Sequence, residues 1–167
     1  GANIAERTVK LRSERGGSRA AAESCTGGEL EARITDIPGA SAVLRGGVVV
    51  YTNDAKHLLL GIPRDTLEKY GAVSREVAAE LAERVRLKLG AQLGVGITGL
   101  AGPDGDGRNP VGTVFVSLSD GTRTWVREKH ISNRDRATVR LYACQNVFDM
   151  LRRYLAGLPV EQERSDI

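Results

Sequence analysis

Two nucleophilic side chains stand next to each other in residues 22–28, which read AESCTGG. The hydroxyl of Ser24 or the thiol of Cys25 can attack an electrophilic carbon once a neighbouring base takes up its proton. No histidine is placed to deprotonate the thiol, because His57 lies on a predicted helix beside a lysine and should point to a different side, and His130 ends a predicted strand. The two groups are therefore rival nucleophiles, and the thiol lacks an evident base.

The same residues 22–28 fall between a short strand of small residues and an amphipathic helix. Backbone N–H groups are unpaired at the start of a helix, and Gly27 and Gly28 let a ligand approach the backbone closely. This seam is therefore suited to a bound phosphate or a transient oxyanion. The alternative, which the local pattern supports equally, is that Ser24 or Thr26 only caps the helix.

A tyrosine and a lysine are predicted near this seam. Tyr51 ends the second predicted strand, and Lys56 follows five residues later in the first turn of a helix. A lysine serves as the base for a serine when burial or nearby positive charge lowers its pKa, since a protonated ammonium cannot accept the serine proton. The alternatives are a solvated surface Lys56 and a Tyr51 that packs in the core rather than orienting Lys56 or donating to a substrate.

A glycine-rich loop, TGLAGPDG at 98–105, follows the third predicted strand. It offers the hydroxyl of Thr98 and the backbone of Gly99 at the carboxyl end of a strand, where open α/β sheets bind ligands. No GKS or GKT follows, which excludes a P-loop NTPase. Arg136 and Arg140 lie one helical turn apart near the start of the last predicted helix, so they would hold a phosphate or carboxylate together if they face the crevice; otherwise solvent surrounds both.

The elements that must position these residues alternate between strands and helices. Sequence patterns predict strands at 18–23, 42–51, 93–98, 111–118 and 122–130, and helices at 4–14, 26–37, 53–60, 63–70, 74–89 and 132–155. The predicted helix caps are Asn53 or Asp54, Ser74, and Ser132 or Asn133. Residues 42–51 are typical of a buried strand, Gly46 and Gly47 within it indicate a bulge or a close backbone approach, and Asp120-Gly121 indicates a hairpin. We therefore expect an α/β fold with three layers, α/β/α, around a mixed sheet of about five strands.

The composition limits the class of protein. The 167 residues fit a single domain over 1–167, whose charged tail after about residue 157 we expect to fray. Lys and Arg exceed Asp and Glu by 24 − 21 = 3, and aromatic residues make up 4%, so a nucleic-acid partner is not expected. Two distant cysteines without a Cys/His cluster argue against a metal site, and the lack of a long apolar run argues against a membrane span. We expect a reduced, cytoplasmic protein.

Five strings in these regions resemble the CinA C-terminal domains, the nicotinamide-nucleotide amidohydrolases of the PncC type, also called NMN deamidases. The strings are AESCTGG at 22–28, GGVVVY at 46–51 followed by Asn53 and Lys56, GAVS at 71–74, TGLAGP at 98–103 and PVGTV at 110–114. They occur in the family's order and cover nearly the whole chain. On these residues the chain is identified as similar to that family.

The resemblance implies hydrolysis of the carboxamide of nicotinamide mononucleotide, which gives nicotinate mononucleotide and ammonia in pyridine nucleotide salvage. It implies that Ser24 is the nucleophile and Lys56 its base, with Tyr51 and Thr98 completing the polar site and an acyl-enzyme as the intermediate. The N–H groups around Thr26, Gly27 and Gly28 are then the candidates for the oxyanion hole.

An arginine of the last helix is expected to meet the substrate phosphate, and we favour Arg140 over Arg136. The resemblance further implies a homo-oligomer that binds a small-molecule nucleotide and uses neither a metal nor a cofactor. A second class of function stays open, namely a non-catalytic nucleotide-binding or regulatory module associated with competence. The loop 104–109 is shorter than the family's usual version, which bears on the rim of the pocket.

Overall fold

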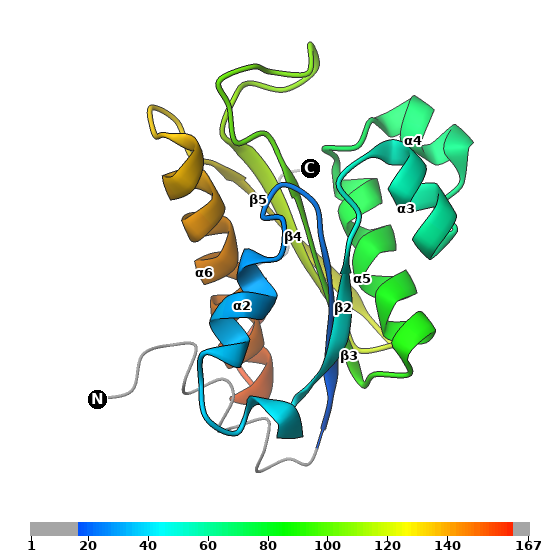
Figure 1. The fold of residues 1–167 in the computed structure, drawn as a ribbon, viewed down its shortest axis with the longest axis vertical. Helices are drawn as coiled ribbons and strands as arrows, with labels where there is room; N and C mark the ends of the chain where they lie inside the picture. Colours follow the sequence, from blue (N-terminus) through cyan, green and yellow to red (C-terminus); the bar gives the residue numbers. More distant parts are fainter. Residues whose placement is uncertain (1–16, 162–167) are drawn as a thin grey trace.

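A mixed sheet forms the middle layer of residues 17–161, the part of the chain that the computed structural model describes (Figure 1). The strand order is β2-β1-β3-β4-β5. The first three strands of the chain are parallel, and the last two run antiparallel to their neighbours. The strands are β1 (Arg19–Glu23), β2 (Leu44–Val49), β3 (Leu93–Gly99), β4 (Thr113–Ser119) and β5 (Thr124–His130).

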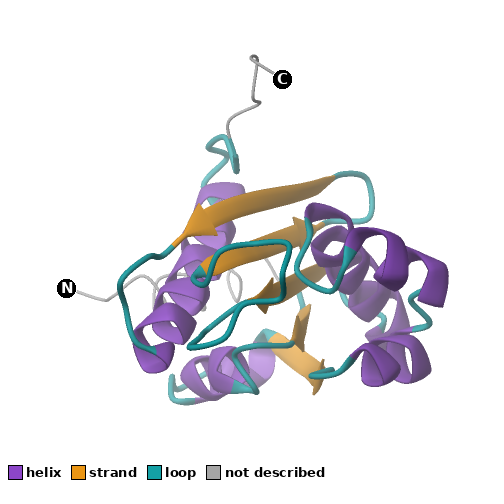
Figure 2. Cartoon of the chain, turned by 90° about the horizontal axis from the view of Figure 1, so that it is seen from above, coloured by secondary structure: helices purple, strands orange, loops and turns teal. Residues whose placement is uncertain are grey.

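Helices cover both faces of this sheet, as the view from above shows (Figure 2). One face carries α2 (Glu29–Thr35) and α6 (Arg136–Leu155), and the other carries α3 (Asn53–Leu60), α4 (Arg64–Tyr70) and α5 (Arg75–Leu89). A short 3-10 turn, η1 (Ala40–Ala42), precedes β2. The predicted three-layer α/β/α fold with a mixed five-stranded sheet is confirmed. The helix predicted at 4–14 lies outside the described residues.

The three parallel strands bring their carboxyl ends to the same edge of the sheet. In the observed register, Glu23 of β1 lies beside Val49 of β2 and Ile97 of β3. The residues that follow these three positions therefore gather in one place, although they are far apart in the sequence. This edge is where an open α/β sheet binds its ligands.

The helix α5 lies directly against the sheet because β3 contains glycine where they meet. A Cβ atom on Gly94 would lie 2.0 Å from the carbonyl oxygen of Ala82, so no larger residue fits there without moving the helix. At the start of α5, the Ser74 hydroxyl accepts a hydrogen bond from the N–H of Val77 at 3.2 Å, which confirms the predicted cap. Gly94 thus sets how closely the middle of α5 packs on the sheet.

Two other predicted caps are wrong. Thr52, not Asn53 or Asp54, caps α3 and accepts from the N–H of Ala55 at 3.1 Å. Asp135, not Ser132 or Asn133, caps α6 and accepts from the N–H of Thr138 at 2.8 Å. In both cases the capping residue has an extended backbone, which lets its side-chain oxygen reach back to the third residue of the helix.

The strand β2 lies at the edge of the sheet, which corrects its interpretation as a buried strand. Val49 is 43% exposed, because β2 has β1 on one side and no strand on the other within residues 17–161. Its two glycines show both features that were proposed for them. The register with β1 shifts beside Gly46, and a Cβ atom on Gly47 would lie 2.6 Å from the carbonyl oxygen of Ala21.

Residues 158–161, which follow α6, are held against the sheet and differ from the fraying expected after about residue 157, and the rest of that tail lies outside the described residues. Val160 is 4% exposed, and its carbonyl accepts from the guanidinium of Arg127 at 3.2 Å. The same guanidinium donates to the carboxylate of Glu161 at 2.9 Å. A buried arginine on β5 thus anchors residues 158–161.

Candidate active site

Lys56 is buried beneath the edge of the sheet where the parallel strands end. It occupies the first turn of α3, and only 1% of the residue is exposed. Its Nζ lies 3.0 Å from Ser24 Oγ, 2.9 Å from the carbonyl oxygen of Val50 and 3.4 Å from that of Tyr51. The alternative of a solvated surface lysine is therefore wrong.

Burial lowers the pKa of Lys56 to about 8 from its usual 10.5, and the neighbouring Cys25 opposes this shift only weakly. Among residues 17–161, no carboxylate forms an ion pair with it that would restore the charge. A neutral lysine has two N–H donors and one lone pair, which match the carbonyls of Val50 and Tyr51 and the hydroxyl hydrogen of Ser24. The surroundings therefore suit an amine that accepts the serine proton.

Backbone pairing within the sheet positions Ser24, and burial makes the neighbouring Cys25 much less reactive. The N–H of Ser24 donates to the carbonyl of Ile97 at 3.0 Å, which extends the pairing of β1 with β3 by one residue. Burial raises the pKa of the Cys25 thiol to about 12, so the reactive thiolate is scarce at neutral pH. Of the two rival nucleophiles, only Ser24 touches a base within the described residues.

Ser24 and Lys56 open into a pocket of about 220 Å³ above this edge of the sheet. The wall of the pocket comes from residues that follow β1, β2 and β3, from the segment before α5, and from the first turn of α6. Its polar and reactive members are Ser24, Cys25, Tyr51, Lys56, Thr98, Asp104 and Arg136. Six sequence-predicted site residues therefore line this pocket, namely Ser24, Tyr51, Lys56, Thr98, Gly99 and Arg136.

Thr98 and Gly99 end β3 on the pocket wall. The hydroxyl of Thr98 donates to the carbonyl of Ala72 at 2.7 Å, which ties β3 to the segment before α5. A Cβ atom on Gly99 would lie 2.8 Å from the side chain of Val114, so the strand needs glycine at this position. In the predicted loop 98–105 these first two residues are thus strand, and the irregular segment begins at Leu100.

Arg136 and Tyr51 form the rim of the pocket. The guanidinium of Arg136 donates to the carbonyl of Gly102 and lies 3.5 Å from the Tyr51 hydroxyl. Tyr51 is 57% exposed, so it is not a core aromatic. A cation and a phenol at the mouth of the pocket are suited to an anionic group on a ligand whose reactive end reaches Ser24.

Arg140 lies outside the pocket wall, in contrast to the preference for it over Arg136. Its guanidinium donates to the carbonyl of Thr26 at 2.8 Å and lies 3.9 Å from the carboxylate of Glu29. Arg136 therefore lies at the pocket, whereas Arg140, four residues later in the helix, holds residues 24–28 after β1.

Thr26, Gly27 and Gly28 also lie outside the pocket wall. The N–H of Gly27 donates to the carbonyl of Ser24 at 3.0 Å, so it is already used inside the turn. The helix begins only at Glu29, because Gly27 and Gly28 have positive φ angles of 60° and 105° that no helix contains. Neither Ser24 nor Thr26 caps it, since α2 has no side-chain cap at its N-cap residue, Gly28.

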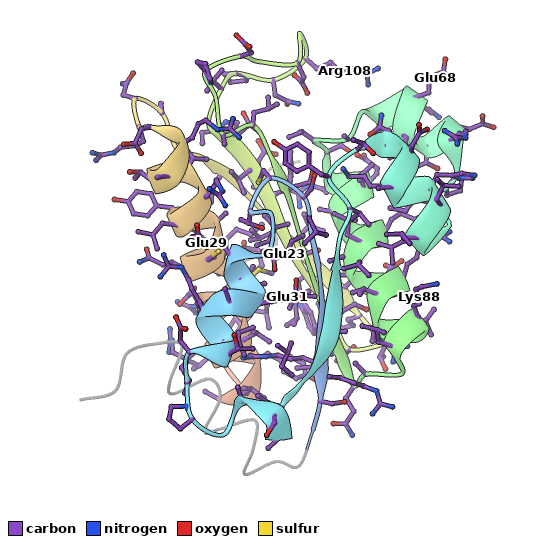
Figure 3. All side chains as sticks on the ribbon, viewed as in Figure 1. Glu23, Glu29, Glu31, Glu68, Lys88 and Arg108 are labelled. Carbon is purple, nitrogen blue, oxygen red and sulfur yellow. The ribbon has the colours of Figure 1, made fainter. Side chains whose placement is uncertain are left out.

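The loop 100–112 forms the outer wall of the pocket and is tied to the other side of the molecule. Arg108 donates to the carbonyls of Glu68 and Lys69 at 2.9 and 3.0 Å, and Figure 3 shows Arg108 and Glu68 at the top of the molecule. The side-chain amide of Asn109 donates to the carbonyl of Val73 at 3.0 Å. Residues 100–102 and Asp104 thus line the pocket, and Arg108 and Asn109 tie the rest of the loop to α4 and to the segment before α5.

Comparison with known proteins assigns this arrangement to a family. The family model of the CinA C-terminal domain matches residues 1–155. The chain belongs to the CinA C-terminal domain family. A relative from Caldanaerobacter subterraneus, named as competence-damage inducible, is 46% identical over 158 residues, which cover 93% of this chain and 38% of that protein. A CinA-like protein from Desulfovibrio desulfuricans is 49% identical over 152 residues, which cover 89% of this chain and 36% of that protein.

Solved structures agree with the CinA assignment. The competence/damage inducible protein CihA from Agrobacterium tumefaciens superposes with a TM-score of 0.87 at 35% identity, covering 92% of this chain and 93% of that one. A CinA superfamily protein from Klebsiella pneumoniae gives a TM-score of 0.89 at 28% identity, covering 92% and 96%. The chain spans somewhat more than a third of the length of the curated relatives it matches.

One residue of this CinA domain escapes sequence reasoning and lies at the site, namely Glu23, which is fully buried and directly precedes Ser24. Asp104, the acid of the glycine-rich loop 98–105, lines the pocket. The signal for Glu23 was a charged residue at the end of a strand of alanines, where an apolar residue is expected. Within residues 17–161, no cluster of three or more His, Cys, Asp or Glu side chains could hold a metal, and no helix is long and apolar enough to cross a membrane.

Proposed function

We propose that this domain hydrolyses the carboxamide of nicotinamide mononucleotide to nicotinate mononucleotide and ammonia, with Ser24 as nucleophile and Lys56 as base. The observation that carries the proposal is the 3.0 Å contact between Lys56 Nζ and Ser24 Oγ in a buried setting that lowers the pKa of the lysine. The choice of substrate rests on the motifs shared with the NMN deamidases of the CinA family.

In the first half of the reaction, the neutral amine of Lys56 accepts the proton of Ser24 as Oγ bonds to the carboxamide carbon. The tetrahedral intermediate collapses with cleavage of the C–N bond, and the ammonium of Lys56 gives its proton to the departing nitrogen, which leaves as ammonia. An acyl ester on Ser24 remains. Among the residues of the pocket wall, Cys25 follows the nucleophile directly, the position whose N–H stabilises the oxyanion in other serine hydrolases.

In the second half, Lys56 takes a proton from a water molecule that attacks the ester. The new C–O bond forms, the bond to Ser24 Oγ breaks, and the proton returns to that oxygen as nicotinate mononucleotide leaves. Arg136 at the rim binds the 5′-phosphate of the substrate, a role that its planar guanidinium fits. We also propose a soluble homo-oligomer as the working form, as the family resemblance implies.

The test is ammonia release from nicotinamide mononucleotide by the purified protein and by Ser24→Ala and Cys25→Ala variants. We expect loss of about 10³-fold or more in kcat for Ser24→Ala, because the nucleophile is gone. Cys25→Ala is the matched control, since it changes the adjacent residue of the same turn, and its kcat should stay within a few fold of the wild type.

Two results would count against the proposal. A Ser24→Ala variant that retains the wild-type rate would exclude Ser24 as the nucleophile. A wild-type protein that binds nicotinamide mononucleotide by calorimetry but releases no ammonia would favour the non-catalytic nucleotide-binding module instead. Both measurements use the same protein and the same ligand, so the two classes of function are separated directly.

A further inference from the structure

The residue before the nucleophile is a carboxylate that holds the turn in place. Glu23 is the last residue of β1 and is fully buried. Its carboxylate accepts the hydroxyl of Thr26 at 2.6 Å, the N–H of Leu30 at 2.9 Å and the N–H of Glu31 at 3.0 Å. Glu23 thus accepts hydrogen bonds from N–H groups in the first turn of α2 although it lies outside the helix, and it replaces the side-chain cap that the helix lacks.

Glu31 completes this arrangement with its own carboxyl group. Its side chain hydrogen bonds to the carboxylate of Glu23, and Figure 3 shows the two residues where α2 meets β1. Burial, this hydrogen bond and the charge of Glu23 raise the pKa of Glu31 to about 8. A second negative charge beside the buried carboxylate of Glu23 is therefore disfavoured. On β2, a Cβ atom on Gly47 would lie 2.2 Å from Glu31 Oε1, so the glycine provides the space for it.

The charged groups around the pair are engaged elsewhere. On α2, Glu29 pairs with Arg33 at 3.2 Å, and from α6 Arg140 lies 3.9 Å from Glu29. Among the ion pairs of residues 17–161, none includes Glu23 or Glu31. The negative charge of Glu23 is therefore balanced by hydrogen-bond donors instead of a cation, as in buried carboxylates with two or three N–H partners.

The turn 24–28 carries the proposed nucleophile and is held by both Glu23 and Arg140. Thr26 is held on both sides, because its hydroxyl donates to Glu23 and its carbonyl accepts from Arg140. Ser24 lies between Glu23 and Thr26 in the chain and cannot shift without breaking one of these contacts. Since a displacement of about 1 Å at a nucleophile can cost about 100-fold in rate, the anchors bear directly on its alignment with Lys56.

We propose that Glu23 is a positioning residue, whose hydrogen bonds to Thr26, Leu30 and Glu31 fix the turn 24–28 so that Ser24 Oγ stays on Lys56 Nζ, and that the neighbouring carboxyl group of Glu31 supports it. The proposal rests on the proposed function, because it concerns the alignment of the same nucleophile and base. It assigns to Glu23 no contact with substrate. Ionisation of Glu31 places a second negative charge beside the buried carboxylate of Glu23, and their repulsion loosens the turn.

The experiment compares Glu23→Gln, Glu31→Gln and Glu76→Gln in the full chain. Glu23→Gln replaces one acceptor oxygen by an NH₂ group that faces N–H donors, so we expect kcat for nicotinamide mononucleotide to fall about 100-fold with KM within a few fold. Glu31→Gln keeps a donor to Glu23 and removes the titration, so it should keep the wild-type kcat at pH 7 and exceed the wild type at pH 9. Glu76, an exposed acid in the first turn of α5, is the matched control and should behave as the wild type.

A second measurement separates this proposal from the proposed function. Hydrogen exchange followed by mass spectrometry reports on the amides of Leu30 and Glu31 whether or not the protein is an amidase. We expect faster exchange at these amides in Glu23→Gln, and in the wild type on going from pH 7 to pH 9 beyond the intrinsic change, but not in Glu31→Gln.

The outcomes are distinct. If the wild type releases no ammonia, the proposed function fails, while the exchange data still decide whether the pair holds the turn. An active protein whose Glu23→Gln variant retains kcat and the exchange pattern would overturn the positioning role. An activity at pH 9 that Glu31→Gln does not raise above the wild type would overturn the role of Glu31 in holding the turn.

Discussion

Two segments follow neighbouring parallel strands into the same pocket, and they are built in opposite ways. The turn 24–28 after β1 buries Ser24, Cys25 and Thr26, and its contacts involve a buried carboxylate and backbone groups. The loop 100–112 after β3 is exposed over 103–108, and it is tied down by the side chains of Arg108 and Asn109 at the surface.

On the proposed function, this difference indicates that the turn serves the reaction and the loop serves the binding of substrate. Hydrogen bonds to buried charged groups contribute about 1.5–3 kcal/mol each, whereas neutral ones contribute about 1 kcal/mol, and exposed ones compete with water. The turn therefore has little freedom, as a nucleophile requires, and the loop has more, as a wall that adapts to a substrate can have. Changes in the turn should lower kcat, and changes in the loop and rim should raise KM.

The largest effect is expected from Lys56, the proposed base that faces the turn. In Lys56→Met the amine is lost, and kcat should fall about 10²- to 10⁴-fold, the range for general base catalysis. Lys56→Arg keeps a cation that cannot be deprotonated, so it should lose as much. Ammonia release and thermal melts of the folded variants provide the measurement. A Lys56→Arg variant within tenfold of the wild type would contradict the base role.

The pH profile should follow the same lysine. In Glu31→Gln, where the second carboxyl group no longer titrates, kcat should rise about tenfold per pH unit below 8 and level off above it, because the proposed base is the neutral amine and the pKa of Lys56 is about 8. In the wild type the rate above pH 8 should be lower, because Glu31 ionises there. A rate that stays constant between pH 6 and 8 would show that the active lysine does not change protonation there.

Arg136 and Arg140 of α6 are expected to give a smaller effect, and they test the comparison most sharply. Arg136→Ala should raise KM for nicotinamide mononucleotide about tenfold or more with little change in kcat, because a charged contact to phosphate is lost. Arg140→Ala should instead lower kcat, because Arg140 holds Thr26 of the turn. Nicotinamide riboside, which lacks the phosphate, is the control substrate. If Arg136→Ala raises KM equally for both substrates, the guanidinium does not bind the phosphate.

The sequence patterns predict the layers and most element positions because apolar periodicity and turn residues are local signals. The parallel register is also local in origin, since strands that alternate with helices end at one edge. Ser24 and Lys56 could therefore be expected near each other, but their contact at 3.0 Å depends on how deeply α3 packs, which no local pattern reports. Local patterns also cannot distinguish Arg136 from Arg140, because a difference of one helical turn decides which of them meets the pocket.

Glu23 marks where local reasoning is weakest. A carboxylate in a strand end is interpreted as a surface residue unless its partners are known, and those partners, Thr26, Leu30 and Glu31, become neighbours only once the turn and α2 have formed. The caps of α3 and α6 were predicted wrongly for a related reason. Thr52 and Asp135 have neighbours with an equal propensity to cap a helix, and the backbone geometry decides which residue does so.

The smallest effect is expected from the anchor of the loop. Arg108→Ala removes the hydrogen bonds to the carbonyls of Glu68 and Lys69, which lie at the exposed end of α4, so we expect KM to rise only about two- to threefold with kcat unchanged. Glu68→Gln is the matched control, because Arg108 binds the backbone of Glu68 and not its carboxylate, and it should leave both constants unaltered. If Arg108→Ala lowered kcat as strongly as Glu23→Gln, the loop would belong to the machinery that aligns the nucleophile, and the division between a fixed turn and an adaptable wall would fail.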